Sequence, residues 1–526
     1  MSNLSVFENE YTWGKAVANN AVSEFDDKYE KSFAEVKTDL GKEYPIIING
    51  KEVFLDNKFD VKSPSDTRII VAKFPQATKD DTIDAIESAK NAFSEWSLTP
   101  FKQRAQIFKD CADLFSRQKF RLAAIMSLEN GKNRVEGMGD VDEAIDFMRF
   151  YAYQLESNEG FEKETPHPNP KEKTRTVLKP YGVWGIIAPF NFPSAIAIGM
   201  TTGALVTGNT AVLKPASDTP LSSFKFAEAI YKNLPPGAFN FVTGPGSIVG
   251  KTLIENPLVS GIAFTGSKEV GMSGFQKFTE KRVKPFISEM GGKNPVIVTE
   301  NADLEKAAEG VMRAAFGYGG QKCSACSRVY VQKNIADEFI KKLLEKTDSL
   351  KIGLPWKKEV FLGPVINKAA KEKFQSVIDL AKKDGQILRG GSVLRDGDYE
   401  HGYYIEPTII TKLPRDHKLV KEELFLPILC VDEFETYDEA IQLANDTEYG
   451  LTAGVFSKSK EELEKFFNEI QAGTVYANRA SSATTAALVQ SQPFVGWKDS
   501  GISSRGAGGE RYLQQFLRTQ TQTRCD

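Results

Sequence analysis

Apolar and polar residues alternate in two different ways along the chain. In the first third, apolar residues recur every three to four positions, and this spacing predicts helices over residues 80–93, 101–118, 121–130 and 141–155. A charged segment at 30–40 is also helical in pattern. Short apolar runs at 46–49 and 52–54 flank Asn49-Gly50, a pair typical of a β-hairpin turn. We therefore expect a helical first third that contains one hairpin.

From residue 177 the pattern changes to short apolar runs that alternate with helical segments. Runs at 183–188, 211–213, 239–242 and 261–264 alternate with helical segments at 194–207, 222–232 and 247–256. After Pro295 the alternation resumes, with strands at 296–298, 328–331 and 428–434 and helices at 303–316, 335–349 and 368–383. This order predicts an α/β protein with two doubly wound parallel sheets, whose ligands bind beyond the carboxyl ends of the strands.

Two polar segments do not fit either pattern. Residues 158–173 contain three prolines and are predicted to form a loop or a linker between domain pieces. The final segment, 516–524, ends in Arg-Thr-Gln-Thr-Gln-Thr-Arg and has the alternation of a polar strand. We expect this strand to add to a sheet edge, which could lie across a subunit boundary.

Composition and charge exclude several classes of protein. A chain of 526 residues needs more than one core, and 41% apolar with 26% charged residues excludes wholesale disorder. The 67 basic and 70 acidic side chains are interspersed, so neither a nucleic acid nor a membrane surface is expected as a partner. The N-terminus lacks the pattern of a signal peptide, and the longest apolar stretches are too short to span a bilayer. Five cysteines are a poor disulfide framework, which favours the cytoplasm.

A cysteine and a glutamate are the leading candidates for chemistry. Cys323 lies in the polar, glycine-led segment Gly-Gly-Gln-Lys-Cys-Ser-Ala-Cys-Ser-Arg (319–328), where an attacking thiol would have open space and a neighbourhood that favours thiolate. Glu289 precedes two nearby glycines in Ser-Glu-Met-Gly-Gly-Lys. A nucleophilic thiol with a separate carboxylate base indicates chemistry through a covalent acyl or hemithioacetal intermediate.

Cys323 and Cys326 also form a Cys-x-x-Cys pair, which has two other interpretations. A zinc site would need a second cysteine pair or suitably spaced histidines, and the chain has only three histidines, so we expect no metal. A dithiol redox pair is typical of the start of a small βαβ domain and not of the middle of a long chain. We favour a single working thiol at Cys323, with Cys326 as a helical neighbour that faces elsewhere.

Several segments could hold a cofactor. Glycine-rich turns at 243–250 and 265–271 follow predicted strands and open helices, as phosphate-binding turns do, although such turns also occur for steric reasons alone. Neither is a regular dinucleotide fingerprint or a Walker loop. Lys214 ends a buried strand and is either a cofactor ligand or a solvated loop lysine. Asn191 is either an oxyanion donor or the holder of a proline turn.

Seven motifs in order carry a family resemblance. They are Pro-Phe-Asn-Phe-Pro (189–193), Gly-Asn-Thr-Ala-Val-Leu-Lys-Pro (208–215), Phe-Thr-Gly-Ser (264–267), Glu-Met-Gly-Gly-Lys-Asn-Pro (289–295), Gly-Gln-Lys-Cys (320–323), Glu-Glu-Leu-Phe-Leu-Pro (422–427) and Asn-Asp-Thr-Glu-Tyr-Gly-Leu (445–451). Over essentially its whole length the chain resembles the NAD(P)-dependent aldehyde dehydrogenase superfamily. The sequence around Cys323, the string Glu-Ala-Ile-Asp-Phe (143–147) and the extension ending in Tyr-Pro (44–45) are similar to the 1-pyrroline-5-carboxylate (glutamate semialdehyde) dehydrogenase branch.

The resemblance implies a mechanism and a set of sites. Cys323 would attack the aldehyde, Asn191 and the Cys323 N–H would hold the oxyanion, and Glu289 would activate water. The residues implied to bind NAD(P) are Ala188, Pro189, Lys214, Ser217, Gly246, Gly250, Phe264, Thr265, Gly266, Ser267, Gly271, Met290, Gly291, Glu423 and Phe425. Those implied to bind the aldehyde are Ser324, Ala486, Ala487 and Phe494.

The resemblance also implies three structural units. An NAD(P)-binding domain would comprise 1–156, including an N-terminal extension, and 179–288. A catalytic domain would comprise 289–495, and a small oligomerisation β element would comprise 157–178 and 508–526. At least a homodimer is expected.

Departures from the family pattern keep alternatives open. Ser217 stands where many NAD-selective members have Glu, which leaves NADP open beside NAD as the cofactor. Leu426 stands where the family usually has Gly. The loop 480–492 is longer than usual, with Ala486 at a usual glycine position, so another short semialdehyde or a general aliphatic aldehyde is the alternative substrate. An acylating reaction with coenzyme A would not need a base such as Glu289, and the combination with Asn191 argues against a non-enzymatic relative.

Overall fold

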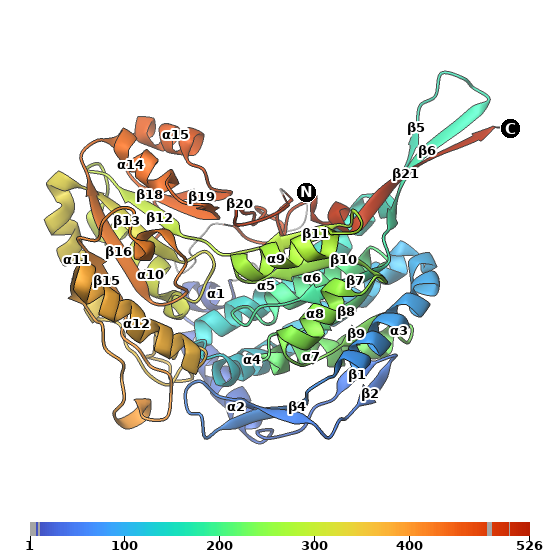
Figure 1. Cartoon of the computed structure of the whole chain (residues 1–526), viewed down its shortest axis with the longest axis horizontal. Coiled ribbons are helices and arrows are strands. Elements are labelled where there is room, and N and C mark those ends of the chain that lie inside the picture. The colour runs from blue at the N-terminus through green and yellow to red at the C-terminus, as the bar shows by residue number, and fades with distance from the viewer. Residues whose placement is uncertain (1–6, 9–10, 481–486, 504, 526) are drawn as a thin grey trace.

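The fold is built around two large sheets and a projecting arm (Figure 1). The structure, a computed structural model, describes residues 7–8, 11–480, 487–503 and 505–525. No helix within these ranges is both long and apolar enough to cross a lipid bilayer. The predicted α/β class with two parallel sheets is confirmed.

The first large sheet has the strand order β11-β10-β7-β8-β9-β1-β2. Its strands are β1 (Ile46–Ile48), β2 (Lys51–Val53), β7 (Val183–Ile187), β8 (Thr210–Lys214), β9 (Phe239–Phe241), β10 (Val259–Thr265) and β11 (Phe286–Glu289). Strands β7 to β11 are parallel, and β1 pairs antiparallel with β2 and β9. The predicted hairpin is confirmed, since Ile48 pairs with Lys51 and both Asn49 and Gly50 adopt the positive φ that its turn requires.

The second large sheet has the order β14-β15-β16-β13-β12-β18-β19. Its strands are β12 (Asn294–Val298), β13 (Cys326–Gln332), β14 (Gln386–Arg389), β15 (Thr408–Thr411), β16 (Ile428–Phe434), β18 (Thr452–Phe456) and β19 (Thr474–Ala477). All neighbours are parallel except β14 and β15. Two short strand pairs lie outside the large sheets, β3 (Lys58–Lys62) with β4 (Ile70–Pro75) and β17 (Tyr449–Gly450) with β20 (Trp497–Lys498).

The helices follow the predicted alternation with one correction. Those before the second sheet are α1 (Thr12–Ala18), α2 (Val22–Lys37), α3 (Lys79–Leu98), α4 (Phe101–Glu129), α5 (Arg134–Ser157), α6 (Ala195–Val206), α7 (Pro220–Ile230), α8 (Lys251–Glu255) and α9 (Lys268–Thr279). Those of the second part are α10 (Leu304–Phe316), α11 (Ala336–Asp348), α12 (Lys368–Asp384), α13 (Lys418–Lys421), α14 (Tyr437–Asn445) and α15 (Lys460–Glu469). The prediction of two helices over 101–118 and 121–130 is wrong. They form the single helix α4, because no glycine or proline interrupts the segment.

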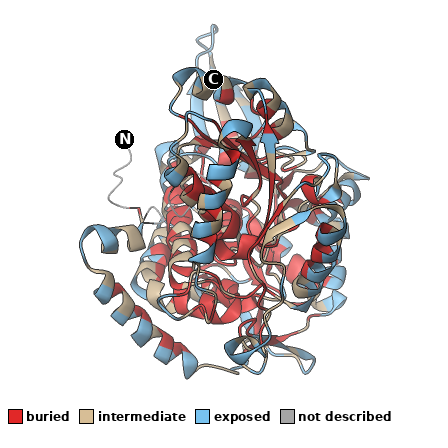
Figure 2. Cartoon of the chain, turned by 90° about the vertical axis from the view of Figure 1, so that its left-hand side faces the viewer, coloured by how far each residue is buried: buried red, intermediate tan, exposed pale blue. Residues whose placement is uncertain are grey.

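Burial follows the two sheets. Buried residues concentrate on the strands and on the helix faces that cover them, while the outer helix faces are exposed (Figure 2). Trp184 and Leu213 belong to a core of the first sheet, and Val296, Val329 and Phe339 belong to a separate core of the second. Each sheet therefore has its own hydrophobic support, and the loops at the carboxyl ends of the strands are free to carry chemistry.

The arm is a three-stranded antiparallel sheet in the order β21-β6-β5, and it projects from the body (Figure 1). The loop predicted for 158–173 is wrong in part, because β5 spans Glu162–Thr165 and β6 spans Glu172–Pro180. The terminal strand is confirmed as β21 (Leu517–Cys525), which pairs with β6 of the same chain from Leu517–Pro180 to Cys525–Glu172. The assignment of residue ranges to domains stays a prediction.

Candidate active site

One cavity of about 570 Å³ receives side chains from many parts of the fold. Cys323, Ser324 and Glu289 line it together with Phe264 and Thr265 at the end of β10. Further walls come from α5, the start of α6 and the C-terminal loop that contains Ala487 and Phe494. The structure thus brings the predicted nucleophile and the predicted base to the same cavity.

The loop that carries Cys323 is held in an unusual backbone conformation. Tyr318, Gly319 and Gly320 have φ values of 49°, 64° and 65°, which is the left-handed region. A Cβ at Gly320 would lie 2.3 Å from the Leu426 carbonyl oxygen, so only glycine fits there. The Gln321 side chain accepts a hydrogen bond from the Ile366 N–H at 2.8 Å and donates one to the Tyr318 carbonyl at 3.1 Å.

Asn294, the first residue of β12, holds the same loop in place by side-chain hydrogen bonds. Its side-chain amide donates to the Cys323 and Ala325 carbonyls at 2.7 and 2.9 Å and accepts from the Thr452 N–H at 3.0 Å. A Cβ at Gly292 would lie 2.4 Å from the Cys323 carbonyl oxygen, which explains one of the two glycines after Glu289. Sequence reasoning missed Asn294 as a site residue, although it lies within the Glu-Met-Gly-Gly-Lys-Asn string.

The surroundings of Cys323 disfavour the thiolate, contrary to the sequence-based expectation. The side chain is partly exposed. Burial in the cavity wall raises the pKa of its thiol, and the nearby carboxylates of Glu423 and Glu289 raise it further. The backbone N–H groups of Ser324 and Cys323 lower the same pKa by a smaller amount. The thiol therefore needs a proton acceptor, or an added positive charge, before it can attack.

Glu289 is the last residue of β11 and has an unused oxygen. Burial raises the pKa of this carboxyl well above its ordinary value, and the N–H of Gly496 lowers it only in part. Its Oε2 is buried and has no hydrogen-bond partner in the part of the chain that the structure describes. A basic oxygen beside a cavity, without a protein donor, is suited to accept a proton from water.

Asn191 lies in the loop between β7 and α6, which begins with Ala188 and Pro189. The Ala188 N–H donates to the Lys214 carbonyl at 3.0 Å, which ties this loop to the end of β8. Asn191 is buried, and its neighbour Phe192 lines the cavity. The loop therefore reaches the cavity that contains Cys323.

The predicted cofactor residues gather where strands of the first sheet end. Lys214 is 5% exposed and donates from Nζ to the Pro215 carbonyl at 2.7 Å, so the alternative of a solvated loop lysine is wrong. Burial lowers the pKa of Lys214 to about 8. A Cβ at Gly250 would lie 3.8 Å from the Lys214 side chain, while one at Gly246 would meet open space. Ser217 is exposed and donates to the Gly244 carbonyl at 3.3 Å.

The second glycine turn supports the start of α9. The Ser267 hydroxyl caps this helix by accepting a hydrogen bond from the Val270 N–H at 3.4 Å, and Ser267 is exposed. Phe264 and Met290 are buried beneath the turn and leave no room for a Cβ at Gly271. Gly266, in the turn itself, is equally confined, since a Cβ there would lie 2.6 Å from the Phe264 ring. Backbone N–H groups at such a helix start are suited to a phosphate.

Glu423 and Phe425 lie in the loop between α13 and β16. Glu423 accepts a hydrogen bond from the Gly292 N–H at 2.9 Å, and burial raises the pKa of its carboxyl to about 7. A Cβ at Gly291 would lie 2.2 Å from Glu423 Oε2, so a larger residue at this position would displace the Glu423 carboxylate. The Phe425 ring meets the Phe190 ring edge to face at 5.7 Å.

The predicted substrate residues are described only in part. Ser324, Ala487 and Phe494 line the cavity, and the Phe494 N–H donates to the Ala507 carbonyl at 2.9 Å. Ala486 lies outside the described residues. Residues of helix α5, among them Glu136 and Phe147, line the same cavity.

Several cavity residues were missed by sequence reasoning. Lys322 and Glu136 form an ion pair of 2.6 Å in the cavity wall. The position of Lys322 directly before Cys323 was the sequence signal that could have identified it as a site residue. Tyr11 and Trp13 at the N-terminus also line the cavity. No local signal marks them, because this segment is held by Asp142, which is 130 residues from Thr12.

Cys326 is not the helical neighbour that was expected. It begins β13, is buried, and donates from its thiol to the Arg328 carbonyl at 3.4 Å. Burial raises the pKa of the Cys326 thiol to about 12, which counts against a dithiol role. The prediction failed because a strand of the second sheet begins here, immediately after the catalytic loop.

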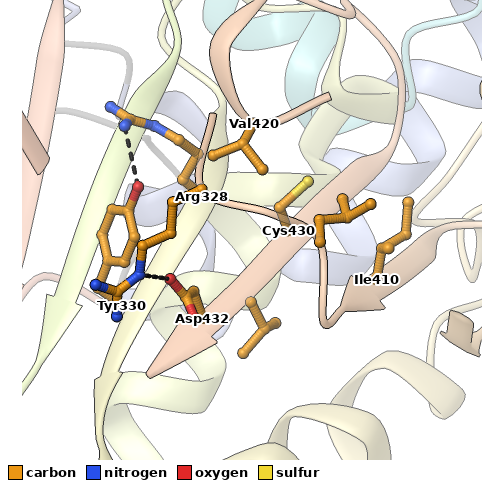
Figure 3. A pocket seen from close by; sticks show the side chains of 9 residues that line it. Arg328, Tyr330, Ile410, Val420, Cys430 and Asp432 are labelled. Carbon is orange, nitrogen blue, oxygen red and sulfur yellow. Dashed lines mark hydrogen bonds and ion pairs between the residues drawn. The ribbon is translucent and has the colours of Figure 1, made fainter. Parts of the chain in front are cut away.

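A second, very small cavity lies beside Cys430, the register partner of Arg328 (Figure 3). Its volume of about 10 Å³ is enough for about one water molecule. The Arg328 guanidinium donates to the Tyr330 hydroxyl at 3.1 Å and also to the Lys293 and Ala444 carbonyls at 2.9 Å. Arg328 is thus a structural tie between β12, β13 and the end of α14, and the cavity is no ligand site.

Known proteins are similar to this chain in sequence and in fold. The model of the aldehyde dehydrogenase family matches residues 54–522. The 1-pyrroline-5-carboxylate dehydrogenase of Geobacillus sp. (strain WCH70) is 38% identical over 500 residues, covering 94% of this chain and 95% of that protein. A mutant structure of Thermus thermophilus 1-pyrroline-5-carboxylate dehydrogenase matches with a TM-score of 0.91 at 35% identity, covering 95% of this chain and 96% of that one. A structure of the Thermus enzyme with bound NAD matches with a TM-score of 0.90 at 35% identity and the same coverage. The chain belongs to the aldehyde dehydrogenase family.

Proposed function

We propose that this protein oxidises glutamate 5-semialdehyde, the open form of 1-pyrroline-5-carboxylate, to glutamate with NAD, as a step of proline catabolism. The observation that carries the proposal is that Cys323 and Glu289 line one cavity, where Glu289 Oε2 has no hydrogen-bond partner among the residues that the structure describes. The relatives named 1-pyrroline-5-carboxylate dehydrogenase span nearly the full length of both chains, which supports the substrate.

The chemistry begins with Cys323. Its Sγ forms a bond to the aldehyde carbon while the carbonyl electron pair moves to oxygen, giving a thiohemiacetal. The thiol proton leaves to the carboxylate of Glu289 or Glu423, since burial raises the pKa of both groups, and it passes on to solvent before Glu289 acts as a base. The Asn191 amide and the Cys323 N–H hold the oxyanion.

The residues at the strand ends fit a dinucleotide. Lys214 would contact the adenosine ribose, and the start of α9 with Ser267 would hold the pyrophosphate. Glu423 and Phe425 would hold the nicotinamide end. The open space at Gly246 leaves room for the dinucleotide to approach the backbone. When bound, NAD would supply the acceptor for the hydride of the thiohemiacetal carbon, and loss of that hydride leaves a thioester on Cys323. Ser217 carries no charge to repel a ribose phosphate, so NADP stays an alternative cofactor.

Glu289 completes the reaction. Its free oxygen takes a proton from water, the water oxygen attacks the thioester carbon, and the carbon–sulfur bond breaks to release the acid and the Cys323 thiolate. Ser324, Ala487 and Phe494 would hold the α-carboxylate end of the substrate, beside the Lys322–Glu136 ion pair.

A second candidate substrate is a bulkier, general aliphatic aldehyde. The cavity of about 570 Å³ lies in the range of sites that hold drug-sized ligands, which is more than a five-carbon substrate needs. The longer 480–492 loop favours the same alternative.

We also propose a homodimer or larger homo-oligomer in the cytoplasm. The projecting arm has mostly exposed side chains on β21 and leaves β5 and β21 as edge strands, which are suited to pair with another copy. All five cysteines are free, as is usual in a reducing compartment.

Steady-state reduction of NAD and NADP tests the function, with 1-pyrroline-5-carboxylate beside succinate semialdehyde, propanal and benzaldehyde. A preference of tenfold or more in kcat/KM for 1-pyrroline-5-carboxylate, about 1.4 kcal/mol, is expected. Equal or better turnover of the other aldehydes would move the enzyme to another pathway.

A further inference from the structure

Lys132 is a fully buried cation for which the proposed chemistry has no use. Its side chain has no exposed surface, and its Nζ lies 2.9 Å from Oδ2 of Asp140, which is also fully buried. Moving an ammonium out of water is costly, even when the ion is paired. We therefore expect this buried ion pair to hold neighbouring segments in a defined position, which an apolar pair would not do.

The Lys132 ammonium lies on two aromatic rings from two different loops. Its Nζ is 3.6 Å from the centroid of the Phe192 ring and 5.1 Å from that of Tyr318. Phe192 follows Asn191 directly, and Tyr318 lies five residues before Cys323. Cation–π attraction within about 6 Å is favourable and is strongest where water is excluded. The Lys132 ammonium therefore contacts both the loop that contains Asn191 and the loop that contains Cys323.

Each loop has a second anchor at the same place. Oδ1 of Asp140 accepts a hydrogen bond at 2.7 Å from the N–H of Ala195, the first residue of the helix that follows the Asn191 loop. The Tyr318 hydroxyl donates to the Asn130 carbonyl at 2.9 Å, and the Lys132 N–H donates to the Asn130 side chain at 3.1 Å. Tyr318 needs such support, because its left-handed backbone is strained for an aromatic residue.

We propose that Lys132 is a positioning residue that fixes the Asn191 loop and the Cys323 loop relative to each other, so that the two oxyanion donors converge on one point. The inference rests on the proposed function, which assigns those donors to the Asn191 amide and the Cys323 N–H. An oxyanion develops both when the thiohemiacetal forms and when the thioester is hydrolysed. Misplacing a donor therefore slows both steps and leaves ground-state binding nearly unchanged.

A matched pair of variants at Tyr318 isolates the ring contact. Tyr318→Phe and Tyr318→Leu both lose the hydroxyl donor to Asn130, but only the leucine loses the ring that faces Lys132. We expect kcat of Tyr318→Leu to be about tenfold or more below that of Tyr318→Phe, with KM for aldehyde and for NAD within about threefold. Equal kcat values for the two variants would overturn the inference.

A double variant tests the cation itself. Lys132→Met with Asp140→Asn removes both charges and so leaves no orphaned ion. We expect thermal stability near that of the wild type, kcat lower by about 10- to 1,000-fold, and faster amide hydrogen exchange in 189–193 and 318–323 but not in α12. Wild-type kcat, or unchanged exchange in both loops, would refute the role; if this protein does not fold, the Tyr318 pair decides.

Arg104 provides the control for general destabilisation. It is another buried cation, but it donates to the Val206 and Thr99 carbonyls and contacts neither loop. Arg104→Met should lower the melting temperature and leave kcat within about threefold; a kcat loss equal to that of the double variant would overturn the inference.

Hydrogen exchange needs no substrate and so separates the two proposals. A wild-type protein that oxidises no aldehyde would refute the proposed function, while the exchange of the two loops would still test the positioning role.

Discussion

Glu289→Gln replaces one carboxylate oxygen of the proposed base by an amide nitrogen. Glutamine has the same shape and retains an oxygen for the Gly496 N–H, but it cannot accept a proton from water. We expect hydride transfer in the first turnover to persist and thioester hydrolysis to slow. The measured result would be a burst of one reduced cofactor per Cys323, followed by a slow steady state.

The size of the effect follows from the two carboxylates near the thiol. A positioned general base contributes about 10²- to 10⁴-fold, or about 3 to 5 kcal/mol. The Glu423 carboxylate, whose own pKa is raised to about 7, also raises the pKa of the Cys323 thiol. It remains in the variant as a weaker general base. We therefore expect the lower half of that range, about 10²- to 10³-fold in the hydrolysis rate.

The same substitution has a consequence for stability whose sign is fixed by burial. The pKa of Glu289 is raised in the folded protein, so its contribution to stability is complete below the ordinary pKa of 4.5 and is lost as the pH rises through the folded-state value. Glutamine does not titrate. The melting temperature of Glu289→Gln should therefore rise relative to the wild type as the pH increases from 5 to 9.

Stopped-flow absorbance of the reduced cofactor and thermal unfolding at several pH values measure both effects. A linear time course from the first turnover would refute the role of Glu289 in hydrolysis. A difference in melting temperature that is independent of pH would refute the assignment of a buried, protonatable carboxyl.

Four further variants test the single thiol, the cofactor preference and a buried carboxyl of α4. Cys323→Ala should abolish dehydrogenase activity, whereas Cys326→Ala should retain it, because the Cys326 thiol is buried against the Arg328 carbonyl; equal losses would contradict the single-thiol chemistry. Ser217→Glu should lower kcat/KM for NADP at least tenfold relative to NAD, because a carboxylate repels the ribose phosphate; an unchanged ratio would place that phosphate elsewhere. Burial raises the pKa of Glu129 from 4.5 to about 7, so the stability it contributes is lost as the pH rises through that range, by about 3 kcal/mol. Thermal unfolding should show the wild type losing that advantage over Glu129→Gln between pH 5 and 8, and a constant difference would contradict the assignment.

Local patterns were sufficient for most elements. The Asn49-Gly50 turn and the apolar runs of the parallel strands carry their signal within a few residues, so the hairpin and the two-sheet plan could be predicted. The segment 158–173 could not, because the polar strands β5 and β6 are defined by their pairing in the arm and not by an apolar pattern. Residues 101–129 were divided in two because a weakened pattern resembles a break, although no helix-breaking residue is present.

The sequence by itself determined the fold class, the family and the chemical types of the candidate groups, because these depend on residue identity and order. It did not determine how the groups behave. Burial raises the pKa of Glu289, and burial together with the carboxylates of Glu423 and Glu289 raises the pKa of Cys323. The contact of Lys132 with Phe192 and Tyr318 joins segments that are distant in the chain. Dielectric environment and long-range contact are properties of the folded molecule, and only the tertiary structure could decide them.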